Sequence, residues 1–273
     1  MRLATIRLNS GTAAVRVDDG STATVIDGFT DLSDLLCDPD WEQIARDATG
    51  GTVDFDRRDL AAVVPRPGKI VCVGLNYASH IREMGRELPQ YPTLFAKFAE
   101  ALTGPYDDVL VPSYAASALD WEAELAFVIG KPAYQIAEAD APDYIAGYSV
   151  INDYTMRDYQ YRTPQWDQGK SFEKTCGFGP FLVTDYPGST TIETRLDGEV
   201  MQHANTSDLV FTPAMLVEYI SHIVTLRPGD VVITGTTGGV GHARNPARYI
   251  EDGQTVEIRI EGLGTVSNTT IVK

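Results

Sequence analysis

Short runs of apolar and β-branched residues, each ended by Gly, Asp or Pro, recur along most of the chain. Such runs predict strands joined by turns. The segment 212–226 instead has an apolar stripe at helical spacing. Because the strands do not alternate with helices, the pattern argues against a doubly wound sheet and predicts a β-rich α+β fold. The stripe consists of Met215, Leu216, Tyr219, Ile220 and Ile223; the expected strands include 69–75, 145–151, 179–185, 191–202, 230–236 and 255–272.

The first part of the chain has the pattern of a small separate unit. Three short strands are expected at 1–9, 11–19 and 22–29, and one helix at 31–48 with Asp31 or Ser33 as its cap. The Pro- and Gly-rich segment that follows reads as a linker. We therefore predict two domains, with a small N-terminal α+β domain at residues 1–65 and the main body at residues 66–273.

One segment of the main body, 119–131, combines an acidic beginning with a strongly apolar second half. Alternate side chains of a strand share a face, so Asp120, Glu122 and Glu124 are expected side by side. Three carboxylates at this spacing repel one another, and burying one without a partner is costly. The segment alone leaves two interpretations open, an edge strand with a solvated acidic face or a cation site.

Composition narrows the classes of partner. Among 273 residues 43% are hydrophobic, which allows a sizeable core, and the net charge of −16 argues against nucleic acid and anionic membranes as partners. No apolar run reaches transmembrane length, and the first residues do not resemble a signal peptide. Three scattered cysteines, Cys37, Cys72 and Cys176, lack metal spacing. We expect buried, inert thiols and a cytoplasmic location.

Two segments resemble phosphate loops. Residues 168–172 resemble the end of a Walker A loop, but the motif requires a glycine where this chain has Pro164. The glycine-rich segment 234–243 follows a strand without matching a dinucleotide-binding motif. A plain turn is the favoured interpretation, although its backbone N–H groups are able to approach an anion.

Polar side chains elsewhere leave alternatives open. His80 and Glu83 are three positions apart and share a face of the predicted helix. They form either a general base with its supporting carboxylate or a surface ion pair. Lys170 is either an exposed, inert lysine or a cation that stabilises an enolate. Arg157 and Gln160 follow Asp153 closely and either line the same pocket or face water.

Seven motifs in order resemble the fumarylacetoacetate hydrolase family, over residues 69–273. They are VGLNYASH with Glu83, ALTGP, DWEAELAFVIGK, GYSVINDYTMRDYQ, GKSFEKTCGFGP, LDGEVMQHANTSDLVF and LRPGDVVITGTTGGVG. The resemblance implies a roll of mixed β-sheets, a small N-terminal domain and a homodimer.

The resemblance also implies roles for individual residues. Glu122, Glu124 and Asp153 would bind Mg²⁺ or Mn²⁺, with Ca²⁺ as a further candidate, and three oxygen ligands suit such ions. His80 and Glu83 would activate water, and Lys170 would hold an enolate. Gln160 and Thr236 would lie near the substrate, with Arg157 as a further candidate in that pocket.

The expected activity is metal-dependent hydrolysis of a C–C bond in a 2,4-dioxo acid of the acylpyruvate, fumarylacetoacetate or fumarylpyruvate type, through a metal-bound enolate. The alternative is a decarboxylase or tautomerase of a 2-oxo dicarboxylic acid, and a non-catalytic family member is a further alternative. Gly177, Phe178 and Phe98 depart from the family pattern, and we expect them to reshape the acyl pocket.

Overall fold

The computed structural model describes residues 1–273 except residues 10, 84 and 86, and for Glu83 it describes the backbone alone. The largest sheet has 11 strands within this described part, and it contains both parallel and antiparallel pairs. Its order is β4-β3-β2-β1-β13-β11-β10-β16-β5-β6, with β7 paired to β13. The strands are β1 Arg2–Leu8, β2 Gly11–Val17, β3 Thr22–Val25, β4 Thr52–Asp54, β5 Ile70–Gly74, β6 Thr93–Lys97, β7 Leu102–Thr103, β10 Ala123–Ile129, β11 Ile145–Asn152, β13 Cys176–Val183 and β16 Val231–Thr236.

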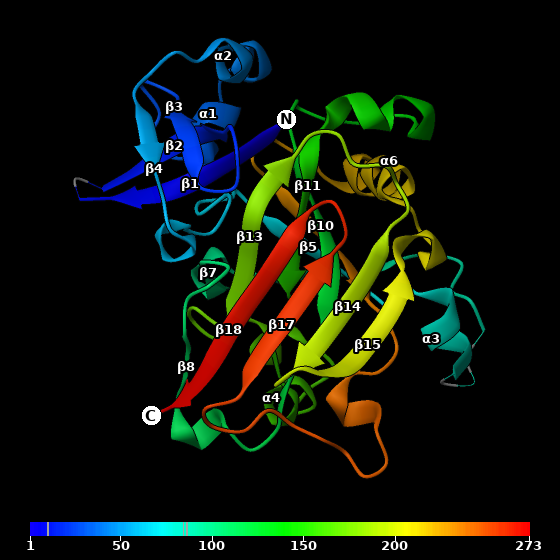
Figure 1. The fold of residues 1–273 in the computed structure, drawn as a ribbon. Coiled ribbons are helices and arrows are strands. Elements are labelled where there is room, and N and C mark those ends of the chain that lie inside the picture. Colours follow the sequence, from blue (N-terminus) through cyan, green and yellow to red (C-terminus); the bar gives the residue numbers. More distant parts are fainter. Residues whose placement is uncertain (10, 84, 86) are drawn as a thin grey trace.

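A second, five-stranded sheet lies in front of the first in Figure 1, with the order β15-β14-β17-β18-β8. Alternate residues of these strands are buried, as expected for a sheet with one covered face. The buried side chains pack with Trp121, Ala123 and Leu125, which alternate with the acidic residues of the segment 119–131. The strands are β8 Val109–Val111, β14 Thr191–Leu196, β15 Glu199–Asn205, β17 Thr255–Ile260 and β18 Gly264–Val272; β9 Leu119–Asp120 and β12 Thr155–Met156 form a separate pair.

The N-terminal strands extend the main sheet, because β1 pairs with β13. The segment 31–48 forms two helices and not the single expected helix, since the chain turns at Asp38, Pro39 and Asp40. Asp31 caps the first helix as expected, and its side chain accepts the Ser33 backbone N–H at 2.7 Å. The two helices are α1 Leu32–Leu36 and α2 Trp41–Asp47.

The helix expected at 212–226 is α6, Pro213–Ile223, which lies to the upper right of the sheets (Figure 1). Its buried face is centred on Leu216, Val217 and Ile220, whereas Ile223 is 64% exposed. The predicted stripe was therefore wrong at its C-terminal end. The remaining α-helices within the described residues are short: α3 Ala78–Glu83, α4 Arg157–Gln160 and α5 Asp167–Lys170.

The strand-rich architecture confirms the β-rich α+β fold class, whereas the domain boundary near residue 65 stays a prediction. Cys72 and Cys176 are buried as expected, but Cys37 is exposed, because it follows α1 at the surface. In the described part of the chain, none of the helices combines the length and apolarity that crossing a membrane requires.

Candidate active site

The acidic segment forms the centre of the main sheet and not its edge. It bends at Trp121 and Glu122, between β9 and β10, and β10 then pairs with β11 on one side and β16 on the other. Asp120, Glu122 and Glu124 are 0%, 7% and 2% exposed. A solvated acidic face is thus excluded, and these buried carboxylates require positive partners.

Three carboxylates converge at this end of β10. Asp153 directly follows β11, and its backbone N–H donates to the Glu122 carbonyl at 2.9 Å. One oxygen from each of Glu122, Glu124 and Asp153 lies within 4.8 Å of the others. The antiparallel pairing of β10 and β11 thus brings together residues that are 29 or more positions apart in the sequence.

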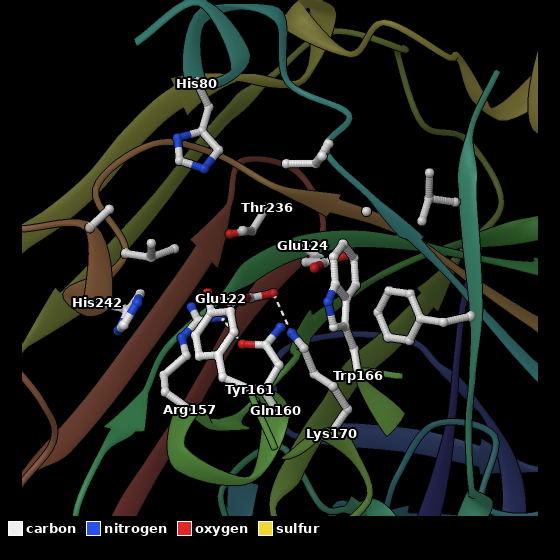
Figure 2. Close-up of a pocket in the computed structure, with 16 residues that line it drawn as sticks. His80, Glu122, Glu124, Arg157, Gln160, Tyr161, Trp166, Lys170, Thr236 and His242 are labelled. Carbon is white, nitrogen blue, oxygen red and sulfur yellow. Dashed lines mark hydrogen bonds and ion pairs between the residues drawn. The ribbon is translucent and has the colours of Figure 1, made fainter. Parts of the chain in front are cut away.

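Two buried lysines partly neutralise this cluster. Lys170 Nζ lies 2.6 Å from Glu122 Oε2 (Figure 2). It also lies 2.7 Å from Asp153 Oδ2. Lys97 Nζ lies 2.9 Å from Asp153 Oδ1 and donates a hydrogen bond to the Lys170 carbonyl. Burial alone would raise the pKa of Asp153, but the charges of the two lysines outweigh it and lower that pKa. Burial alone would lower the pKa of Lys170, but Asp153 and Glu122 raise it, so Lys170 is cationic at neutral pH.

Glu124 is the least neutralised member of the cluster. Its Oε2 accepts the backbone N–H of Gly235, and in the described part of the chain no ion pair joins it to a lysine or arginine. Burial, and then the charges of Asp153 and Glu122, raise its pKa well above the usual range. A hard divalent cation fits this donor set, because it would supply the missing positive charge to three clustered carboxylates, two of which, Glu122 and Glu124, line one pocket.

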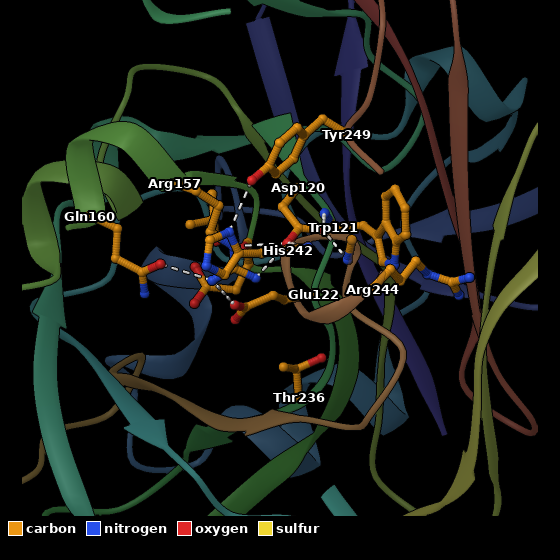
Figure 3. Close-up of polar contacts among 12 residues, drawn as sticks. Asp120, Trp121, Glu122, Arg157, Gln160, Thr236, His242, Arg244 and Tyr249 are labelled. Carbon is orange, nitrogen blue, oxygen red and sulfur yellow. Dashed lines mark hydrogen bonds and ion pairs between the residues drawn. The ribbon is translucent and has the colours of Figure 1, made fainter. Parts of the chain in front are cut away.

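Arg157 joins the cluster to the glycine-rich segment 234–243 (Figure 3). Its Nε donates to Asp120 Oδ2 at 2.8 Å, and its Nη1 lies 2.8 Å from both Glu122 Oε1 and Gln160 Oε1. Asp120 in turn accepts the backbone N–H groups of Gly241 and His242. The glycine-rich segment therefore does bind anions, but these anions are carboxylates of the protein itself.

Arg157 lines the pocket, so of its two expected placements the one facing water is wrong. It is 5% exposed, and Asp120, Glu122 and Gln160 engage its guanidinium. Its contact with substrate stays a prediction. Gln160 also lines the pocket. Because its Oε1 accepts from Arg157, its amide nitrogen is left to donate.

Thr236 lies at the end of β16, opposite Glu124. Its hydroxyl donates to the Ala123 carbonyl at 3.0 Å and accepts from Gln202 Nε2 at 2.8 Å. Gln202 also binds the Ala123 backbone N–H and Thr194, and it thereby fixes the start of β10 from the second sheet.

His80 projects into the pocket from α3, on the side opposite Arg157 and Lys170 (Figure 2). It is 7% exposed. Glu83 ends the same helix, but its side chain lies outside the described part of the chain, so the role expected for the pair stays a prediction.

The pocket has a volume of about 210 Å³. Most of the site residues expected from the sequence line it: Glu122, Glu124, Lys170, Gln160, Thr236, His80 and Arg157. Asp153 is fully buried and is not among the lining residues. Gly177, Phe178 and Phe98 do not line it. Phe178 is buried in the core behind the sheet, Gly177 packs against Asn268, and Phe98 is exposed, so the expectation that they shape the acyl pocket was wrong.

Sequence reasoning missed several residues of the site. Lys97 ends an apolar strand, and that position was its only signal. His242 received no role, yet it lines the pocket, and its Nδ1 lies 2.9 Å from the Tyr249 hydroxyl. The aromatic side chains of Phe95 and Trp166 form another wall, and nothing in their spacing indicated that they would meet.

Fold and site together define a class of protein, a roll of two β-sheets with a buried carboxylate centre at one end of its central strand. Residues 69–271 match the family model described as the fumarylacetoacetate (FAA) hydrolase C-terminal domain. The chain belongs to the fumarylacetoacetate hydrolase family.

Its relatives have different names. The oxaloacetate tautomerase FAHD2A, mitochondrial, of Bos taurus is 43% identical over 216 residues, which are 77% of this chain and 68% of that protein. The solved structure of fumarylacetoacetate hydrolase from psychrophilic Exiguobacterium antarcticum has a TM-score of 0.88 at 29% identity and covers 100% of both chains. The 5-carboxymethyl-2-hydroxymuconate delta-isomerase from Mycobacterium smegmatis has a TM-score of 0.82 at 34% identity, over 100% of this chain and 99% of that one.

Proposed function

We propose that this protein is a divalent-cation-dependent tautomerase of 2-oxo acids of the oxaloacetate type. Hydrolysis was the first expectation and tautomerisation its alternative. The name of the 43%-identical relative and that of the delta-isomerase support the alternative better. The observation that carries the proposal is the cluster of Glu122, Glu124 and Asp153 beside the cationic Lys170, at a pocket that Glu122, Glu124 and Lys170 line.

A cation held by Glu122, Glu124 and Asp153 would be Mg²⁺ or Mn²⁺, and when bound it supplies positive charge beside the 2-oxo acid. Tautomerisation moves one proton between the carbon next to the carbonyl group and the carbonyl oxygen. Lys170 and the Gln160 amide are donors that stabilise negative charge on the substrate oxygens. His80, on the other side of the pocket, removes and returns the proton on carbon.

The test is the rate of keto–enol exchange of oxaloacetate, followed by the ultraviolet absorbance of the enol, with protein that is stripped of metal and then reloaded with Mg²⁺ or Mn²⁺. We expect acceleration only after reloading, and loss of metal binding and activity in Glu124→Gln. Glu193→Gln, on the outer face of the second sheet, is the matched control. Full activity without metal, or in Glu124→Gln, would refute the proposal.

Hydrolysis is the second candidate, because His80 lines the pocket and one structural neighbour is named a hydrolase. Here His80 would take a proton from water, which then attacks the distal carbonyl of an acylpyruvate. Product analysis separates the reactions: hydrolysis yields two acids, decarboxylation yields CO₂, and tautomerisation yields an isomer of equal mass.

The homodimer, which the family resemblance implied, is also a proposal, and light scattering of the purified protein tests it.

A further inference from the structure

The pocket is lined by both polar and apolar groups. Gln160, Lys170 and Thr236 supply a polar side. The contacts of Trp166 with Phe95 and Gly74 define an apolar side, to which the lining residues Val73 and Leu75 are adjacent in the sequence; none of these five was assigned a role from the sequence. A 2-oxo acid group matches the polar side, so the apolar side faces whatever is attached to that group.

Phe95 and Trp166 are held in a fixed arrangement. Their rings meet edge to face, with centroids 5.4 Å apart and an interplanar angle of 77°. On its other side the indole covers Gly74, where a β-carbon would collide with the six-membered ring. The glycine thus makes room for the indole, and the wall is formed before any ligand binds.

This aromatic wall begins next to the proposed donor. Lys170 Nζ lies 5.9 Å from the centroid of the Phe95 ring, and Trp166 immediately precedes α5, the helix that ends at Lys170. Phe95 and Trp166 are both only half-buried, so they present apolar surface to the pocket. A group bonded to the carbon next to the 2-oxo group would lie against that surface.

A second carboxylate would be poorly matched there. Among the described lining residues on the apolar side there is no arginine, lysine or histidine. The nearest cation, Lys170, pairs with Glu122 and Asp153 and is the donor assigned to the oxygens of the 2-oxo acid group, so it does not serve a second carboxylate. A planar unsaturated group, in contrast, buries its faces against aromatic rings with favourable dispersion and quadrupole interactions.

We infer that Phe95 and Trp166 form a subsite for a planar, unsaturated substituent of the 2-oxo acid, so that the protein prefers aryl- or alkenyl-substituted 2-oxo acids to oxaloacetate itself. This inference rests on the proposed function for the placement of the 2-oxo acid group. Trp166 acts as a specificity-determining residue, and Gly74 acts through it.

The test uses the Mg²⁺-loaded protein and two probes, phenylpyruvate, which has an aromatic substituent, and oxalate, which has none. Calorimetry measures the Kd of each, and enol absorbance measures keto–enol exchange of phenylpyruvate and oxaloacetate. We expect Trp166→Ala to raise the Kd of phenylpyruvate about 10-fold and to change the Kd of oxalate by no more than about 2-fold. Trp166→Phe keeps an aromatic face and should raise the Kd of phenylpyruvate by about 3-fold or less. Tyr134→Ala, an exposed aromatic outside the pocket, is the control.

The Gly74→Ala variant tests the same subsite with the indole present. The new methyl group displaces the Trp166 ring, so binding of phenylpyruvate should again weaken more than binding of oxalate. The subsite would be overturned if folded Trp166 and Gly74 variants lost equal affinity for both probes, or lost no affinity for phenylpyruvate. If phenylpyruvate binding depends on Trp166 but no exchange is accelerated, the subsite is supported and the proposed function fails. If the protein accelerates keto–enol exchange of oxaloacetate as efficiently as that of phenylpyruvate, the proposed preference is wrong and the proposed function is supported.

Discussion

Arg157 donates a hydrogen bond of 2.8 Å to Oε1 of Gln160. Both side chains are about 5% exposed, so water cannot readily replace this contact. The bond selects one of the two orientations of the Gln160 amide, in which the nitrogen is available to the pocket. Arg157 thereby decides which hydrogen-bonding group of Gln160 the pocket presents.

The first prediction concerns that amide. Gln160→Glu keeps the shape of the side chain and the acceptor for Arg157, but replaces the donor with a negatively charged oxygen. We expect KM for 2-oxo acids to rise about 10-fold or more with a smaller change in kcat, since a charged substrate would meet an unpaired acceptor. Steady-state kinetics at saturating metal measure this. Gln168→Glu, an exposed glutamine on α5, is the control, and an unchanged KM would contradict the role given to Gln160.

The second prediction concerns Asp120, which no family motif assigned to the metal. It is fully buried and pairs with Arg157 while accepting backbone N–H groups of Gly241 and His242. Asp120→Asn leaves part of a buried positive charge without its partner, and we expect a loss of about 3–5 kcal/mol in the free energy of unfolding. Denaturant titration measures it.

The matched control for Asp120→Asn is Glu199→Gln, which breaks a surface pair with Arg248. We expect that change to cost no more than about 1 kcal/mol, because exposed pairs contribute little. Similar losses in the two variants would show that Asp120 is not the centre of the network.

The third prediction separates stability from function at Glu124. Its carboxylate is buried, with Asp153 and Glu122 nearby, and the charged form is therefore disfavoured in the absence of a cation. Glu124→Gln should raise the free energy of unfolding of the metal-free protein by about 1–3 kcal/mol. The same change should remove the extra stability that saturating Mn²⁺ gives the wild type. Thermal melting with and without Mn²⁺ measures both effects; a variant that Mn²⁺ still stabilises fully would contradict this ligand assignment.

The fourth prediction concerns acid stability. Arg7 of β1 binds Asp107 through two hydrogen bonds of 2.9 and 2.6 Å, and Thr103 donates to the same carboxylate. Burial raises the pKa of Asp107, but Arg7 and Thr103 outweigh it, so the folded-state pKa lies below the ordinary value. The folded protein then binds fewer protons than the unfolded chain, and stability falls as the pH drops from about 4 through the folded-state pKa.

We therefore expect Asp107→Asn to cost about 1 kcal/mol at pH 7, and this difference to vanish in strong acid. Denaturant titrations at several pH values measure it. Asp108→Asn breaks a longer, more exposed pair with Arg58 and is the control. A difference that persists unchanged at low pH would contradict the assignment of the acid effect to Asp107.

Local patterns predicted the strands and the residues that the site uses, but not the contacts between distant segments. Glu122 and Glu124 could be placed on one face because a strand has a period of two, and Asp153 came from the family motif. Lys97 escaped notice because its partner, Asp153, lies 56 positions away and nothing in the intervening sequence predicts that pairing. The contact of Arg157 with Asp120, 37 positions earlier, escaped notice for the same reason.

The single helix expected at 31–48 failed because the local turn at Asp38, Pro39 and Asp40 divides it into α1 and α2. The stripe of α6 failed for a different reason. Helical spacing indicates which residues would share a face, but tertiary packing decides where a helix stops and which part of that face is covered. Ile223 continues the apolar pattern of α6, but it is not part of the core cluster that Leu216, Val217 and Ile220 join, and it is left at the surface.

The pairing of β1 with β13 has a consequence for how the molecule melts. Leu3, Leu35 and Trp41 of the N-terminal part share one core with Ile70, Phe178 and Val231. Removing the first 65 residues would strip that core and leave β13 with unpaired hydrogen-bonding groups, a template for aggregation. We therefore expect the N-terminal strands and the rest of the main sheet to unfold together.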